Sequence, residues 1–168
     1  IFTLSWQDMV IHSATHLFHE GEFQHGLRDL WDLDRMLRDF PDRDPKFWEG
    51  LVSRARELEL QVSVFHGLTY ARLLFGTPLP EGIVEETGNR SISLRKPVMD
   101  FLFLRAFRPE HPQCKLPYTD LALSLLYMRS HWLRMPLYLL LPHLARKAWM
   151  RLFEDDGHSR ESPKIKEL

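Results

Sequence analysis

Apolar residues recur at helical spacing in four successive stretches of the first 76 residues. The first follows Ser5, a residue type that caps helices, and predicts a helix from Trp6 to about Gly21. The second covers 27–40 and should end at Pro41, and the third should start at Asp44 with the proline after it. The fourth, VSVFHGLTYARLLFG, is more uniformly apolar and stops at a glycine, so it predicts a central buried helix. The apolar positions of the first three are Val10, Ile11, Ala14, Leu17 and Phe18, then Leu30, Leu33, Leu37 and Phe40, then Phe47, Trp48, Leu51, Val52, Ala55 and Leu58.

Glycine and proline interrupt the pattern beyond residue 80. Residues 82–96 are expected to be mainly loop, Pro97 to begin a helix over VMDFLFLRAF, and RPEHPQCKLP to have no regular structure. Two more helices are predicted at 119–131 and 136–153, and the polar end EDDGHSRESPKIKEL predicts a disordered tail. No convincing strand alternation appears. The sequence therefore predicts an all-α fold, an irregular bundle of about six to seven helices in one domain over 1–153 with a disordered tail over 154–168.

Composition limits the cellular compartment and the kinds of partner, but it does not indicate a function. The 168 residues carry a net charge of −1, so no global field attracts nucleic acid. A single cysteine, Cys114, excludes an internal disulfide and favours the cytoplasm. The apolar run at 137–141 is far shorter than a membrane span. Because the chain starts at Ile1 in the approach to a helix, we expect further sequence upstream.

Three histidines share one side of the first predicted helix. They are His12, His16 and His19, and on a wheel of about 100° per residue they and Asp8 lie within about 80° of one another. The apolar residues of this helix centre roughly opposite. Imidazoles one turn apart can bind zinc, but HExxH is absent, and a solvated polar face or a face against a partner domain explains the pattern as well. We therefore assign no metal ligand.

Two Asp-x-Asp triplets resemble magnesium-binding pairs but lie in the wrong context. On a helix, Asp32 and Asp34 are about 200° apart, so they cannot share one ion. Asp42 and Asp44 are expected to lie in a loop and to cap the N-terminus of the next helix. Asp29, nearer the apolar stripe, is expected to be the partly buried carboxylate.

No catalytic nucleophile is indicated, since there is no Gly-x-Ser-x-Gly motif and no glycine-rich phosphate loop. Residues 121–153 contain no acidic side chain but five arginines or lysines among aromatic residues. Such a segment suits an anionic membrane surface or a protein or nucleic-acid partner, although the aromatic residues can equally fill the core. The basic residues are Arg129, Arg134, Arg146, Lys147 and Arg151.

The segments DMVIHSATHLF, LRDLWDLDRML, FWEGLVSRARELEL and YARLLFGTPLP resemble, in this order, the C-terminal helical half of an uncharacterised bacterial nucleotidyltransferase family. The resemblance runs from about Trp6 to Pro80. It implies an upstream catalytic sheet domain with a Gly-Ser motif and paired aspartates that hold two magnesium ions. This chain has no Gly-Ser dipeptide, so no catalytic residue and no cofactor is carried over to it.

The resemblance implies that this chain is an accessory domain, inactive alone, that lines the nucleotide and acceptor cleft of that catalytic domain. His12, His16 and Asp32 would bind the nucleotide base or the acceptor. The alternative is a non-enzymatic helical module that docks on a membrane surface or a protein partner. Arg146, Lys147 and Arg151 would make that contact, so the protein would be cytoplasmic or peripheral to the membrane.

Overall fold

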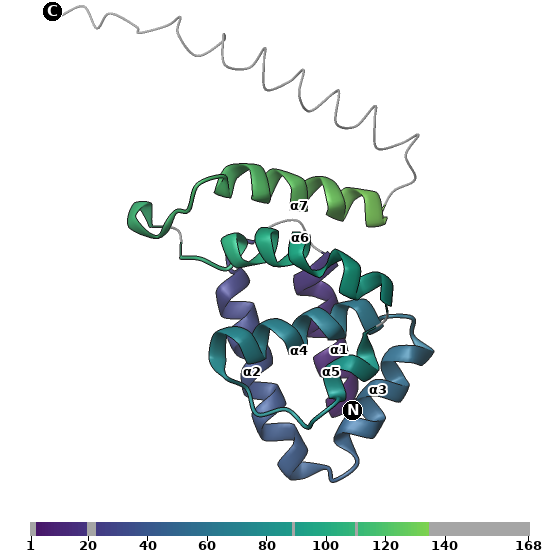
Figure 1. The fold of residues 1–168 in the computed structure, drawn as a ribbon. Helices are drawn as coiled ribbons and strands as arrows, with labels where there is room; N and C mark the ends of the chain where they lie inside the picture. Colours follow the sequence, from purple (N-terminus) through teal and green to yellow (C-terminus); the bar gives the residue numbers. More distant parts are fainter. Residues whose placement is uncertain (1–2, 20–22, 89, 110, 135–168) are drawn as a thin grey trace, which may run out of the picture. The chain divides into compact units, whose positions relative to one another are not determined.

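The computed structural model describes residues 3–19, 23–88, 90–109 and 111–134, with only the backbone of 90–93 and 134. Within these residues there are seven α-helices, one short 3-10 helix and no strand, which confirms the all-α class (Figure 1). The chain divides into two units, Ile1–Ser130 and His131–Leu168, and the packing below is that of the first. The predicted helix at 136–153 and the tail lie outside the described residues. The α-helices are α1 Trp6–His19, α2 Gly26–Arg43, α3 Phe47–Glu57, α4 Gln61–Phe75, α5 Ile83–Thr87, α6 Arg90–Ala106 and α7 Thr119–Arg134.

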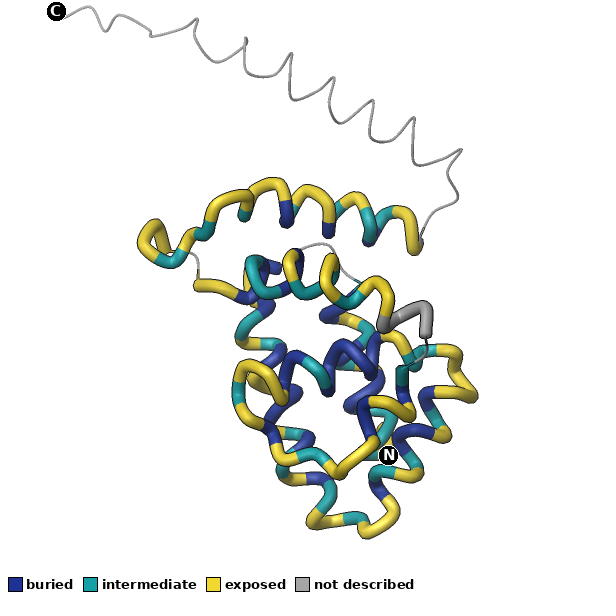
Figure 2. Tube along the Cα trace, in the orientation of Figure 1, coloured by how far each residue is buried: buried dark blue, intermediate teal, exposed yellow. Residues whose placement is uncertain are grey.

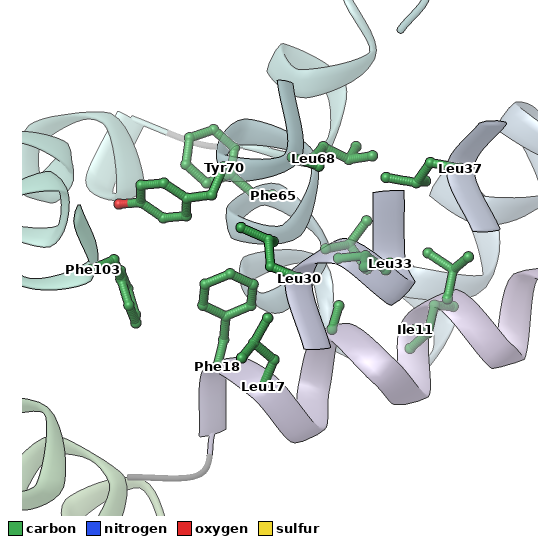
Figure 3. Close-up of a cluster of buried hydrophobic side chains, with 14 of the residues drawn as sticks. Ile11, Leu17, Phe18, Leu30, Leu33, Leu37, Phe65, Leu68, Tyr70 and Phe103 are labelled. Carbon is green, nitrogen blue, oxygen red and sulfur yellow. The ribbon is translucent and has the colours of Figure 1, made fainter. Parts of the chain in front are cut away.

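α1 is the helix on which α2, α3 and α4 all pack. Its N-terminus is capped as predicted, because the Ser5 hydroxyl oxygen accepts a hydrogen bond of 3.1 Å from the Asp8 backbone N–H. The five apolar positions predicted for this helix are all buried. Figure 3 shows two of them, Leu17 and Phe18, directed toward Leu30 of α2. The α1 side of the core therefore follows directly from the 3.6-residue period of the sequence.

α4 is the most completely buried helix, as its uniform hydrophobicity predicted. It lies across α1 and α2, and α5 also packs against it. The helix ends at Gly76, which adopts φ +64° and donates its N–H to the Arg72 carbonyl at 3.0 Å. Only glycine takes this left-handed conformation without strain, so the predicted stop is confirmed with its mechanism.

α6 and α7 add to the same core. Phe103 of α6 is fully buried, and its ring lies 5.0 Å from Phe18 and 5.3 Å from Tyr70. Ala122 and Leu126 of α7 are also buried. The burial colours of Figure 2 show this arrangement as dark segments that turn inward along each helix. No helix among the described residues is long and apolar enough to span a membrane.

Two sequence predictions about helix ends and one about a loop were wrong. α2 continues through Pro41 to Arg43, and α6 starts at Arg90 with Pro97 inside it. A proline inside a helix removes one backbone hydrogen bond, and both helices continue past it despite that loss. The stretch expected to be loop also contains α5, whose Ile83 and Val84 are buried against α4. Burial against α4 explains α5, whereas Leu94 and Val98 on either side of Pro97 are exposed, so burial does not explain why α6 continues through that proline.

Smaller differences occur at two other sites. α3 begins at Phe47 rather than at the Asp-Pro pair, and Asp44 instead accepts hydrogen bonds from the Lys46 backbone N–H at 2.9 Å and from Gln7 at 2.7 Å. The proline-rich segment expected to be irregular holds one 3-10 turn, Pro112–Cys114. There the Gln113 N–H donates to Nδ1 of His111 at 3.3 Å.

Candidate functional site

The histidine face of α1, defined by Asp8, His12, His16 and His19, lies outside the hydrophobic core, as expected. His12 and His16 are exposed, and their rings stack with centroids 6.3 Å apart. His19 is half-buried. This face presents two adjacent imidazoles to solvent near the middle of the helix.

Asp8, at the start of the histidine face, has a structural partner. Its carboxylate accepts a hydrogen bond of 2.8 Å from Nε of Arg54 on α3. That bond, together with a second from the Ser5 hydroxyl, lowers the pKa of Asp8 below its usual value. Asp8 therefore ties α1 to α3.

Asp32 lies on a different helix from the two histidines. It is exposed on α2, about 140° around the helix from the side that carries Leu30 and Leu37. Among the contacts that the structure describes, none joins Asp32 to His12 or His16. The structure thus brings the two histidines together and leaves the third predicted binding residue apart from them.

The described carboxylates do not fit the magnesium ions that the family resemblance implies for a catalytic domain. Asp32 is exposed and Asp34 is buried, so this triplet points to opposite sides, as its helical spacing predicted. Over the described ranges, no group of three or more His, Cys, Asp or Glu side chains is placed to hold a metal ion. We derive no catalytic step from these residues.

Asp34 is the buried carboxylate of α2, and the sequence analysis did not predict its burial. It accepts hydrogen bonds from Nε of Arg38 at 2.8 Å and from the Thr77 hydroxyl at 2.6 Å. Arg38 also donates to the Phe75 carbonyl at 3.0 Å. Asp29, the residue expected to be partly buried, is half-buried, in agreement with that expectation. The burial of Asp34 could have been predicted from its position, because it follows Leu30 by one helical turn and so falls within the apolar stripe.

A groove of about 490 Å³ opens where the N-terminal end of α2 meets the C-terminal end of α4 and the residues after α6. We call it the α2 groove. Its walls combine three aromatic rings with three side chains that carry or can accept a positive charge, and among its described lining residues none is acidic. The sequence reading did not identify this site, because its residues are far apart in the chain. The residues that define it here are Phe23, His25, Arg28, Trp31, Phe75 and Arg108.

A second polar group is buried between α4, α6 and α7. Burial lowers the pKa of His66 to about 3, so this imidazole is neutral near pH 7. The neighbouring Tyr70 hydroxyl donates to Asp100 at 2.9 Å, and burial raises the pKa of that hydroxyl. Lys96 forms an ion pair with the same carboxylate. These contacts link α4 to α6, so we assign them to the fold.

Arg129, the first of the five basic residues noted in 121–153, is part of this buried region. Its guanidinium donates to the Phe18 carbonyl at 2.8 Å, and burial lowers its pKa. It thereby satisfies a carbonyl in the last turn of α1, and it is not available to a membrane surface. Arg146, Lys147 and Arg151 lie outside the described residues.

Residues 1–76 match the model of a family described as uncharacterised nucleotidyltransferase. The match covers 76 of the 168 residues and agrees with the family that the sequence resembles, while the assignment to the C-terminal half of such a protein stays a prediction. The match takes in α1, α2, α3 and α4. No curated protein and no solved structure matches the chain.

Proposed function

We propose that α1 to α4 form the helical part of a nucleotidyltransferase and line its nucleotide and acceptor cleft. The observation that carries this proposal is the family match over residues 1–76, which coincides with α1 and the three helices that pack on it. The catalytic aspartates and their magnesium ions are assigned to a catalytic domain upstream of this chain. The helical part alone would then bind but not catalyse.

The histidine face is the surface proposed to meet the substrate. His12 and His16 are exposed and one turn apart, so their ring nitrogens can donate to or accept from a nucleotide base or an acceptor group. Asp32 is proposed as a separate contact, because it lies on α2 without a described link to them. None of the three is proposed to transfer the nucleotidyl group.

The first test is the mass of the protein isolated from its own cells. The proposal expects a mass well above the 20.0 kDa of this chain, followed by incorporation of label from α-labelled nucleoside triphosphates in the presence of Mg²⁺. A native mass equal to that of this chain would contradict the upstream catalytic domain. A larger protein that transfers no nucleotidyl group to any acceptor in its cell extract would contradict the activity.

The second test asks whether the histidine face binds substrate. In the larger protein, the double variant His12→Ala, His16→Ala should raise KM for nucleotide or acceptor roughly tenfold and leave kcat nearly unchanged, because it removes binding that is equal in ground and transition states. Asp32→Asn should raise KM by a smaller factor. Arg72→Gln, an exposed charge change on α4, is the matched control and should alter neither constant. Unchanged KM in the double variant would remove the histidines from the site.

A second candidate function is docking on an anionic membrane surface. One feature of α7 favours it: Leu121, Leu125 and Met128 are exposed at helical spacing and so form an apolar stripe. The protein should then sediment together with vesicles in which one third of the lipid is phosphatidylserine, at low salt and not at high salt. Replacing Arg146, Lys147 and Arg151 by alanine should abolish this, and equal sedimentation with neutral vesicles would contradict an electrostatic contact.

A further inference from the structure

The α2 groove has the size of a small-ligand site. Its volume of about 490 Å³ falls within the range of about 300–1,000 Å³ that is usual for such pockets. Three segments that are distant in sequence form it: residues 23–31, the end of α4 and the residues that follow α6.

The aromatic walls of the groove offer a surface for a planar ring. Trp31 is half exposed, and it meets Phe75 edge to face with centroids 5.3 Å apart and planes at 85°. Phe23 is buried and packs edge to face on Phe103 and Phe107, which anchors it in the core. An exposed tryptophan fixed by a perpendicular ring is a suitable stacking partner for a heterocycle.

Among the described residues, the charged side chains of the groove have no anionic partner. Arg28 lies one turn before Trp31 on α2, and Arg108 follows α6. Neither guanidinium forms an ion pair or hydrogen bond with any described residue. Other arginines of the first unit are used structurally: Arg38, Arg43 and Arg54 each pair with a carboxylate.

We propose that the α2 groove binds a nucleoside phosphate, with the base stacked on Trp31 and the phosphate held by Arg28 and Arg108. Guanidinium groups bind phosphate oxygens through short charge-assisted hydrogen bonds, and His25 at the same rim can donate another. Aromatic rings and cations together therefore select a planar ring that bears an anion. The choice of a nucleotide over other aromatic anions rests on the proposed function, whereas the requirement for ring and anion rests on the groove alone.

The test is a binding titration of this chain by calorimetry, with probes that separate the two halves of the ligand. The probes are the four nucleoside monophosphates, adenosine, ribose 5-phosphate, inorganic phosphate and the aromatic carboxylate indole-3-acetate. At least one nucleoside monophosphate should bind at least tenfold more tightly than adenosine, ribose 5-phosphate or phosphate, because only the nucleotide uses both walls. In a ¹⁵N NMR spectrum, this nucleotide should shift the indole N–H signal of Trp31. That signal is assigned by its absence from the spectrum of Trp31→Leu.

Matched variants locate the binding in the groove. Arg28→Gln and Arg108→Gln should each weaken nucleotide binding roughly tenfold. Trp31→Leu should weaken it by a similar factor. The controls are Arg35→Gln, an exposed arginine of the same helix outside the groove, and Trp132→Leu, an exposed tryptophan of α7. Both controls should bind like the unaltered chain.

Several outcomes would overturn the inference. They are no nucleotide binding at millimolar concentration, equal binding of adenosine and its phosphate, indole-3-acetate bound more tightly than every nucleotide, or nucleotide binding that the groove variants leave unchanged. The titration needs no catalysis, so it fails independently of the proposed function. Transfer activity in the larger protein without binding here would refute the groove, and binding here in a protein without transfer activity would refute only the proposed reaction.

Discussion

Asp34 illustrates how a single charged side chain is kept inside this fold. Its side chain is 3% exposed, while that of its partner Arg38 is 35% exposed, so the two ends of the ion pair differ in how they reach water. If Arg38 is removed, a carboxylate is left buried with only the Thr77 hydroxyl for a partner. If Asp34 is neutralised, the guanidinium can still turn toward solvent. The pair is therefore asymmetric, and the two halves should not cost the same to remove.

We predict that Arg38→Met lowers the free energy of unfolding by about 3–5 kcal/mol. Asp34→Asn should lower it by about 2 kcal/mol, because it loses charge-assisted hydrogen bonds but buries no isolated charge. Asp39→Asn breaks a pair with Arg43 at the same i,i+4 spacing on the same helix, but both side chains there are about half exposed. It should cost less than about 0.5 kcal/mol. Urea unfolding of the three variants measures this order, and equal losses at Asp34 and Asp39 would contradict it.

At the scale of elements, three helices meet at Gly67 of α4. A Cβ atom there would lie 2.8 Å from Cδ2 of Leu33 on α2 and 3.4 Å from Cβ of Ala14 on α1. Both neighbours are completely or almost completely buried, so neither can move into open space. The close approach of α4 to α1 and α2 thus depends on the missing side chain, which the sequence showed only as a glycine inside an apolar run.

We predict that Gly67→Ala destabilises the protein by about 1–3 kcal/mol through overpacking, although alanine is the better helix former by about 1 kcal/mol. Leu33→Val removes the methyl group in closest contact. In the double variant the alanine should therefore cost less than it does alone, which a double-mutant cycle in urea measures. Additive losses would mean that the helices separate elsewhere to admit the methyl group.

The elements also show what the sequence could and could not predict. α1, α2 and α3 were predictable because each has an apolar stripe, and α4 because it is apolar along its length. Ser5 and Gly76 also marked the start of α1 and the end of α4. Pro41 and Pro97 misled because the local rule that a proline ends or begins a helix does not hold at either position. The α2 groove was not predictable, since its walls come from residues as distant as Arg28 and Arg108, and no spacing rule relates such positions.

For the whole molecule, the buried imidazole of His66 couples stability to pH. Rings of Phe18, Phe65, Tyr70 and Phe103 surround it at centroid distances of 5.3 to 6.0 Å. The charged groups near it are Arg129 and Lys96, which disfavour its protonation, and Asp100, which favours it, but burial is the largest effect. The folded pKa of about 3 lies below the value of 6.5 for an unperturbed histidine. Between these values the unfolded chain binds a proton that the folded chain does not.

It follows that the contribution of His66 to stability is complete above about pH 6.5 and is lost as the pH falls toward 3. Between pH 7 and pH 5 this histidine alone should lower the free energy of unfolding by about 2 kcal/mol. His66→Leu should remove this part of the pH dependence, as measured by urea unfolding at half-unit steps. Phe103→Leu, a nearby packing loss without titration, should lower stability by the same amount at every pH. If the free energy of unfolding of His66→Leu depends on pH as steeply as that of the unaltered protein, the acid sensitivity arises from other groups and not from His66.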